Sequence, residues 1–201
     1  IGGSEIALRI FLLKKLEKFT ELFPDVKIKL TNHSTNQAVN ALKAGLVDFA
    51  VVTTPVNLTN DMKSENLCSF NDILIAGPKY KQLCNKALHL EELQEYPFIS
   101  LVEGTGTHDH YTKFFYDNDL HFNLDMEAST TDQVLAMVQS NLGLGFYPEQ
   151  LASEYIMRGE IFPVSLHESV PERDIILIRE SRHAENIAAK KLINFLKHTT
   201  N

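Results

Sequence analysis

Residues 26–52 read VKIKLTNHSTNQAVNALKAGLVDFAVV, and this stretch decides the fold. Residues 26–30 alternate apolar and charged side chains, which is typical of a strand with one buried face. Residues 34–46 place apolar side chains at helical spacing behind a Ser-Thr-Asn cap. Residues 48–52 are a short apolar run that favours a strand buried on both faces. Strand, helix and strand with short links predict a right-handed crossover and a mostly parallel sheet.

The alternation of helices and strands continues on both sides of this stretch. Upstream, residues 4–23 predict an amphipathic helix capped by Ser4, with Leu13 and Leu22 on its apolar face. Downstream, residues 53–66 have the composition of a loop. We expect further strands over 73–76, 97–101, 123–128, 143–148, 161–166 and 174–178, further helices over 88–93, 110–116, 130–138, 150–157 and 184–197, and a loop over 104–107.

Two successive α/β units follow from this order of elements, with no sequence repeat and no Gly/Ser-rich linker between them. Because no loose linker separates the units, we expect continuous strands to join them. Residues 73–76 and 175–178 are the candidates for these joining strands.

Composition and charge limit the possible functions. The chain has 201 residues, of which 44% are hydrophobic and 22% are charged, as in globular domains. No apolar run approaches the about 18 residues that a membrane span needs. The formal net charge is −7, and the basic pairs at 14–15 and 190–191 fall inside amphipathic helices. We therefore expect that this chain does not bind DNA by itself and contacts no membrane.

The two cysteines and the first residues bear on the compartment and on the extent of the chain. Cys68 and Cys84 lack the CxxC spacing of a zinc site, and reduced thiols of a cytoplasmic protein are expected, with one disulfide as the alternative. The chain opens with Ile1 rather than Met, like the end of an apolar strand. We expect a fragment of a longer protein.

Catalytic patterns are scarce. The sequence has no GxSxG elbow, no P-loop and no GxGxxG. His108 and His110 form an HxH pair, but a third metal ligand at a typical spacing is missing. Glu103 has the pattern of a solvated loop carboxylate. Neither cysteine has activating neighbours in the sequence. We predict no catalytic residue, no metal and no cofactor.

Small hydroxyl residues stand where four predicted helices begin. They occur at 3–4, 34–35, 104–107 and 130–132. Ligands of open α/β sheets bind at the carboxyl ends of strands, beside helix N-termini, where hydroxyls and free backbone N–H groups suit a small polar or anionic molecule. The alternative is that each residue only caps its helix.

Five segments in order give the chain a resemblance to the effector-binding domain of LysR-type transcriptional regulators. They are IGGS at 1–4, FPDV at 23–26, AGLVDFAV at 44–51, LEEL followed by YPFI at 90–99, and VQSNLGLGFYP at 138–148. Each segment is loose alone, but five in this order and spacing are specific. The resemblance covers residues 1 to about 197.

The resemblance implies an α/β fold of two Rossmann-like lobes joined by two crossing strands, similar to type-2 periplasmic binding proteins. Lobe I would comprise residues 1–75 and 177–201, and lobe II residues 76–176. A winged helix-turn-helix domain would precede Ile1 in the whole protein. The resemblance further implies a cytoplasmic homodimer or homotetramer that reaches DNA only through that domain.

An effector cleft is the other implication of the resemblance. Its residues, carried over position by position, would be Gly3, Ser4, Glu5, Ser34, Thr35, Ser100, Leu101, Thr105, Thr130, Thr131, Asp132 and Phe146. Many relatives have a hydroxyl residue where Glu5 and Asp132 stand. Two carboxylates in one cleft would disfavour a dianionic effector and favour a cationic or strongly donating one. The alternative is that both acids only stabilise the first turns of helices.

The sequence therefore predicts a sensor domain that binds a small polar effector and transmits this to a DNA-binding domain. The alternative is a transporter's solute-binding protein of the same fold. An enzyme is a third reading, since prephenate dehydratase has a similar layout, but residues 112–114 are Thr-Lys-Phe and lack the arginine of its Thr-Arg-Phe motif. A pure interaction module is the fourth.

Overall fold

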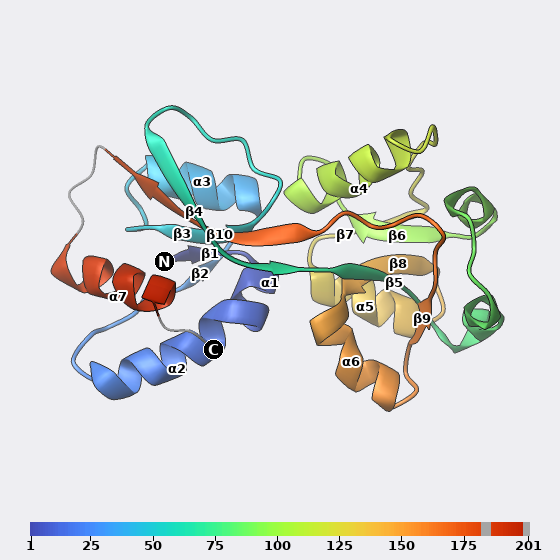
Figure 1. Ribbon diagram of the computed structural model, residues 1–201, viewed down its shortest axis with the longest axis horizontal. Helices are drawn as coiled ribbons and strands as arrows, with labels where there is room; N and C mark the ends of the chain where they lie inside the picture. Colours follow the sequence, from blue (N-terminus) through green and yellow to red (C-terminus); the bar gives the residue numbers. More distant parts are fainter. Residues whose placement is uncertain (182–185, 199–201) are drawn as a thin grey trace. The chain divides into compact units, whose positions relative to one another are not determined.

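The computed structural model describes residues 1–181 and 186–198 and divides the chain into two compact units (Figure 1). Unit 1 comprises Ile1–Ser69 and Asp174–Asn201, and unit 2 comprises Phe70–Arg173. The chain thus passes between units at 69–70 and returns at 173–174, whereas the expected lobe boundaries lie at 75–76 and 176–177. Residues 73–76, considered above as a joining strand, lie wholly inside unit 2.

Unit 1 contains a five-stranded sheet in the order β2-β1-β3-β10-β4. Its strands are β1 (Gly2–Gly3), β2 (Thr31–Asn32), β3 (Ala50–Thr53), β4 (Met62–Phe70) and β10 (Arg173–Glu180). β1 pairs in parallel with both β2 and β3, while β10 runs antiparallel to β3. The sheet is therefore mixed, so the expectation of a mostly parallel sheet holds only for its first three strands.

The first helix of unit 1 spans the predicted range but presents a different face to the core. Ser4 caps α1 (Glu5–Ala7), a π-helical turn (Leu8–Leu12) follows, and α2 (Leu13–Leu22) continues the helix. A π-turn adds a residue and rotates everything after it. Phe11, Leu12 and Phe19 are buried, whereas Leu13 and Leu22 are exposed. The predicted apolar face was wrong at those two leucines.

Two further helices complete unit 1. In α3 (Thr35–Lys43), Ser34 accepts from the N–H of Gln37, whose side chain accepts from the Ser34 N–H, so the first turn is fully capped. α7 (Ile187–His198) lies beside α2 (Figure 1), and the rings of Phe19 and Phe195 meet with centroids 5.4 Å apart. The predicted start of this helix, at 184, lies outside the described residues.

Unit 2 contains a second five-stranded sheet, in the order β7-β6-β8-β5-β9. Its strands are β5 (Asp72–Ala76), β6 (Phe98–Leu101), β7 (Met126–Ala128), β8 (Leu144–Pro148) and β9 (Phe162–Val164). β6 is parallel to β7 and β8, and β5 is antiparallel to β8 and β9. This sheet is likewise mixed.

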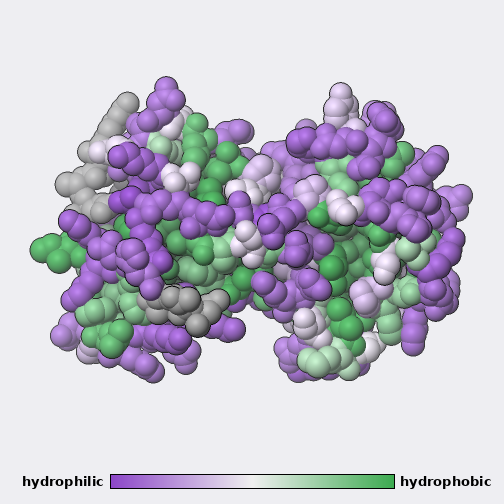
Figure 2. All heavy atoms as spheres, in the orientation of Figure 1, coloured by the Kyte–Doolittle hydropathy of each residue, from purple (hydrophilic) through white to green (hydrophobic). Residues whose placement is uncertain are grey.

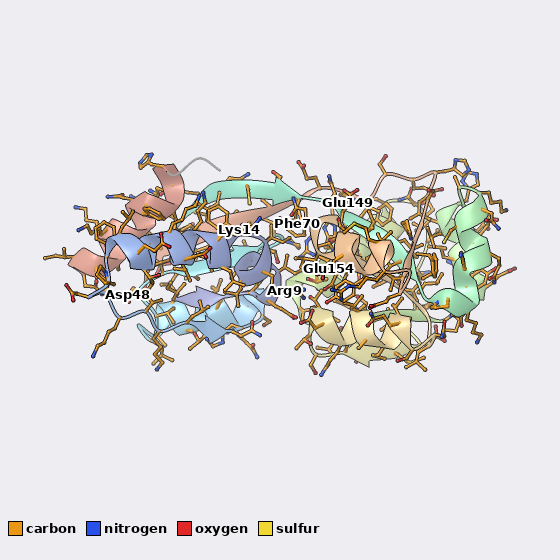
Figure 3. The ribbon with its side chains drawn as sticks, turned by 90° about the horizontal axis from the view of Figure 1, so that it is seen from below. Arg9, Lys14, Asp48, Phe70, Glu149 and Glu154 are labelled. Carbon is orange, nitrogen blue, oxygen red and sulfur yellow. The ribbon has the colours of Figure 1, made fainter. Side chains whose placement is uncertain are left out.

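Both faces of the unit 2 sheet are buried, which explains the unbroken apolar runs in its strands. On one face Leu74, Leu144 and Phe146 pack against the aromatic side chains of α4 (Gly106–Tyr116). On the other face Ile75 and Tyr147 pack with α5 (Thr131–Gln139) and α6 (Glu149–Met157). Glu149 and Glu154 mark the course of α6 in Figure 3.

Several predicted elements have other bounds in the structure. Residues 26–30 are not a strand, and only Thr31–Asn32 pairs with β1. The predicted loop over 53–66 contains the start of β4, and the predicted strand over 123–128 is reduced to β7. The predicted loop over 104–107 already holds the first turn of α4. The turns Pro78–Asn85 and Leu90–Glu95 are 3₁₀ helices, of which only the second was expected to be helical.

Hydrophilic residues cover most of the surface that Figure 2 shows, with apolar residues scattered among them. Isolated exposed apolar side chains such as Leu46 and Met157 are ordinary on globular proteins. Within residues 1–181 and 186–198, no helix has the length and apolar character needed to cross a membrane.

Candidate functional site

The structure gathers the five predicted site residues of unit 1 at one edge of its sheet. Gly3 ends β1, Ser4 caps the helix that follows, and Glu5 occupies the first turn. The Ser4 N–H donates to the Val51 carbonyl of β3 at 3.1 Å, and the Ser4 hydroxyl accepts a long hydrogen bond of 3.4 Å from the Ala7 N–H. The hydrogen bond that the Ser4 hydroxyl accepts is therefore weak.

Ser34 and Thr35 join the same edge because β2 lies beside β1. The Ser34 hydroxyl belongs to the capping box of α3. Thr35 is buried, and its hydroxyl donates to the Thr53 carbonyl at the end of β3, 3.1 Å away. Both side chains thus have structural partners, as the capping alternative expects, and the carboxyl ends of three parallel strands meet here.

In unit 2 the predicted residues also follow the parallel strands. Ser100 and Leu101 end β6, and Thr105 caps α4 a few residues later. The Thr105 hydroxyl donates to the Val102 carbonyl at 2.9 Å and accepts from the His108 N–H at 3.2 Å. Its hydrogen-bonding capacity is largely used, and Leu101 packs against the core under α5.

Residues 130–132 form the N-terminus of α5, directly after β7. The Thr130 hydroxyl accepts from the Gln133 N–H at 3.2 Å, and Thr131 is buried. The exposed Asp132 accepts from the Tyr147 hydroxyl at 3.3 Å. Asp132 therefore has two local roles, in the first turn of the helix and as partner of a buried tyrosine.

Ser100 differs from the other hydroxyl residues. It is 3% exposed, and its Oγ has no hydrogen-bond partner among the described residues. A buried hydroxyl without a partner costs about 1–3 kcal/mol. This orphaned group stands at the carboxyl end of a central parallel strand, where α/β proteins bind ligands.

Phe146 stands apart from the polar residues of the predicted set. It lies in the middle of β8 and is 4% exposed. Its ring stacks on Tyr111 with centroids 4.6 Å apart and meets Phe98 and Phe114 as well. The side chain is therefore a central part of the aromatic core under α4.

Unit 2 also contains a buried polar cluster that was not predicted from the sequence. Arg173 donates from Nη1 to Oδ2 of Asp72 at 3.1 Å, and both side chains are essentially inaccessible. Burial raises the pKa of Tyr111 well above its usual value, and Asp72 adds to this rise. Burial, followed by repulsion from Arg173, lowers the pKa of His110 to about 4. The sequence signal was limited to charged residues directly before two apolar runs, Asp72 before 73–76 and Glu172 to Asp174 before 175–178.

The environments of the two cysteine thiols do not activate them as nucleophiles. Burial raises the pKa of the Cys68 thiol and of the Cys84 thiol, which reduces the nucleophilic thiolate form of each. Among residues 1–181 and 186–198, no three His, Cys, Asp or Glu side chains are grouped so that they could hold a metal ion.

A pocket of about 210 Å³ in unit 1 lies away from the predicted residues. Ile1, Thr31 and Phe49 line it together with residues of α7. These three residues stand at the amino ends of the strands, whereas the predicted site residues stand at the carboxyl ends. None of the predicted site residues lines this pocket.

Comparison with known families agrees with this fold. The model of the family described as "LysR substrate binding domain" matches residues 1–201. The chain belongs to this family. The LysR family model and the curated relatives of this chain are those of transcriptional regulators, so a transporter's solute-binding protein is not favoured.

Curated relatives of this LysR domain are longer than the chain. The HTH-type transcriptional regulator CysB of Haemophilus influenzae is 29% identical over 146 residues, which are 72% of this chain and 45% of that protein. The HTH-type transcriptional activator CmpR of Synechocystis is 26% identical over 137 residues, covering 68% of this chain and 44% of that protein. The chain spans about half the length of the curated relatives that it matches.

Solved structures show the same fold at low sequence identity. The regulatory domain of Synechocystis CcmR in complex with 2-PG superimposes with a TM-score of 0.86 and 13% identity, covering 98% of this chain and 94% of that one. The effector-binding domain of QuiR in complex with shikimate has a TM-score of 0.85 and 15% identity, covering 98% and 93%. The type-2 periplasmic-binding-protein-like fold implied by the sequence resemblance is confirmed.

Proposed function

We propose that this LysR domain is a sensor that binds a small polar effector through the groups at the carboxyl ends of its parallel strands. The orphaned Ser100 hydroxyl carries the proposal, because a buried polar group without a partner is satisfied when a ligand supplies one. The weakly bonded Ser4 hydroxyl offers a similar group in unit 1. Related domains support this reading, since CcmR and QuiR are described in complex with small molecules.

The remaining parts of the proposal concern the whole protein. Effector binding biases a DNA-binding domain, and it does so only if the effector binds two arrangements of the protein with different affinity. The partners are then the effector, further copies of the chain in a homodimer or homotetramer, and DNA through the other domain. Such a regulator acts in the bacterial cytoplasm and catalyses no reaction.

A thermal-shift screen of the 201-residue chain tests ligand binding. The panel contains amino acids, organic acids, sugars, nucleosides and amines. A ligand at about 100 times its dissociation constant stabilises the folded state by about 2.7 kcal/mol. For this size of chain, the melting temperature rises by roughly 5–11 °C. If no compound in the panel shifts the melting temperature, the interaction-module reading is favoured.

The Ser100→Ala variant then tests the site with the ligand that the screen finds. We expect its affinity to fall about tenfold in titration calorimetry, as for loss of one hydrogen bond. We expect no loss of stability, because Oγ has no partner in the folded protein. The exposed Ser153→Ala on α6 is the control. Unchanged affinity in Ser100→Ala would contradict the proposed site.

Asp132→Thr tests the charge of the effector. If Asp132 faces a cationic or strongly donating group, this variant weakens binding of that ligand. If Asp132 serves only Tyr147 and the first turn of α5, affinity is unchanged and stability falls slightly. Calorimetry and urea unfolding on the same sample distinguish the two roles.

A further inference from the structure

The two fully buried charges of unit 2 stand where the chain enters and leaves that unit. Asp72 follows the passage at 69–70 by two residues, and Arg173 is the last residue before the return to unit 1. We call residues 69–72 and 173–175 the crossing segments. All chain connections between the units run through these two segments.

Arg173 binds several neighbours with one side chain, among them Asp72, Thr107 and Phe70. Nη1 donates to Asp72 Oδ2 at 3.1 Å, Nη2 donates to Thr107 Oγ1 at 3.0 Å, and the guanidinium carbon lies 5.2 Å from the centre of the Phe70 ring. Phe70 ends β4 (Figure 3). A planar guanidinium can serve two directions and stack on a ring at once, which an ammonium group cannot.

Asp174, the next residue, links the same two segments within unit 1. The Ser69 hydroxyl donates to Asp174 Oδ1 at 2.7 Å, and the Asp174 N–H donates to the Thr54 hydroxyl at 2.9 Å. Arg173 therefore binds Asp72, and Asp174 binds Ser69. Two consecutive residues of one crossing segment thus contact side chains of the other segment. The two segments are linked inside each unit, within three residues of the passage.

Thr107 connects this arrangement to the candidate effector site. It lies in the first turn of α4, two residues after the Thr105 cap and close in sequence to Ser100. If that turn moves, Arg173 either follows it or loses an acceptor for a buried N–H group, which is costly. The position of this turn is thus tied to the position of Asp72.

We propose that Arg173 is a positioning residue that couples the first turn of α4 to the crossing segments through its bond to Thr107. Effector contact at the N-terminus of α4 is thereby transmitted to the connections between the units. The inference rests on the proposed function for its biological meaning, but the coupling itself exists without a ligand and is tested without one.

A double-mutant cycle followed by amide hydrogen exchange tests the coupling on the 201-residue chain. Thr105→Ala disturbs the cap of α4, and Thr107→Val removes the acceptor of Arg173 while keeping the shape of the side chain. Alone, Thr105→Ala should raise exchange in the crossing segments by about threefold or more. In the Thr107→Val background the same substitution should add almost nothing there.

Matched variants separate coupling from general stability. Thr107→Ser keeps the hydroxyl and should restore the response to Thr105→Ala. Thr112→Val, an exposed threonine of the same helix whose hydroxyl faces His108, should leave the response intact. Additive effects of the two substitutions, or a rise in exchange spread equally over α5 and β6, would show that Arg173 only stabilises unit 2 and would overturn the proposal. Because no ligand is used, this result is independent of the effector screen.

Discussion

Arg173 is among the largest fully buried side chains of the described chain, and its charge is matched by Asp72 in direct contact. A buried ion pair gains little over a well-packed apolar pair, but removal of one partner leaves an uncompensated charge. The pair therefore specifies which segments meet more than it adds to the free energy of folding.

The Asp72→Ala variant should lose about 3–5 kcal/mol of unfolding free energy, because the Arg173 guanidinium then remains buried without its carboxylate. Urea unfolding monitored by circular dichroism measures the loss. The double variant Asp72→Leu with Arg173→Met should recover most of it. Lys113→Ala, which breaks an exposed pair with Asp117, is the control and should cost less than about 1 kcal/mol. A loss as small in Asp72→Ala as in the control would contradict this account.

His110 gives the domain a distinct response to acid. Its pKa is about 4 in the folded protein and 6.5 in the unfolded chain, so the unfolded chain binds the proton first as the pH falls. Stability should therefore decrease from about pH 6.5 down to about pH 4. Unfolding free energies from pH 7 to about pH 5, where most carboxylates stay ionised, measure the slope. The slope should be smaller in His110→Gln, and an equal slope would show that other groups cause it.

At the scale of the element, β8 shows why its sequence needs glycine. A Cβ on Gly143 would lie 2.5 Å from the Pro97 carbonyl oxygen, and one on Gly145 would lie 2.9 Å from Val134. Gly143 stands directly before β8 and Gly145 within it, and a Cβ at either position would force neighbouring atoms to shift. The glycines of the segment that carried the family resemblance are thus explained by packing rather than by turn geometry.

Gly143→Ala should accordingly destabilise the domain by about 3 kcal/mol, the upper end of overpacking costs, because backbone atoms must move. Gly159→Ala is the matched control: its φ of +70° disfavours alanine, but the added methyl group meets open space. We expect the control to lose about 1 kcal/mol. Thermal unfolding of both variants measures which one loses more stability. A larger loss in Gly159→Ala would show that the backbone around Gly143 shifts at little cost in free energy.

Element order was predictable from the sequence, whereas several bounds and faces were not. Alternation at 26–30 is real, since the apolar residues there are partly buried and the lysines exposed. It does not make a strand, because a hydrogen-bonded ladder needs a partner and β1 covers only Gly2–Gly3. Likewise, periodicity assumes a regular helix, so it could not place Leu13 after a π-turn.

The same contrast applies to the site. Hydroxyl residues before apolar helices could be identified, because capping acts over three or four residues and leaves a local pattern. The orphaned state of Ser100 could not, since it depends on what every neighbouring strand and helix places around it. Arg173 was missed because its partner Asp72 is 101 positions away in the sequence.

At the scale of the whole molecule, the two units differ in how the chain builds them. All five strands of the second sheet, and the helices that cover it, lie in the continuous stretch Phe70–Arg173. Unit 1 is discontinuous, since β10 and α7 come from the C-terminal part of the chain. Unit 2 therefore contains its complete core, whereas residues 1–69 alone do not.

A fragment of residues 70–173 should fold and unfold cooperatively on heating, because both of its core clusters are complete. A fragment of residues 1–69 should show no cooperative transition, because β3 lacks its partner β10. Circular dichroism and the dispersion of amide proton signals in NMR spectra measure the difference. If the fragment 70–173 fails to fold while the fragment 1–69 folds, unit 2 depends on unit 1 for folding and the prediction is wrong.

The insertion of unit 2 into unit 1 has a consequence for synthesis on the ribosome. The strands β1 to β4 emerge first, but their sheet is completed only when residues 174–198 have also been made. At about 5–20 residues per second, the early strands wait on the order of ten seconds while the inserted unit emerges and folds. During that interval an unfinished sheet edge of the nascent chain is open to chaperones, and α7 later completes a core that residues 1–69 began.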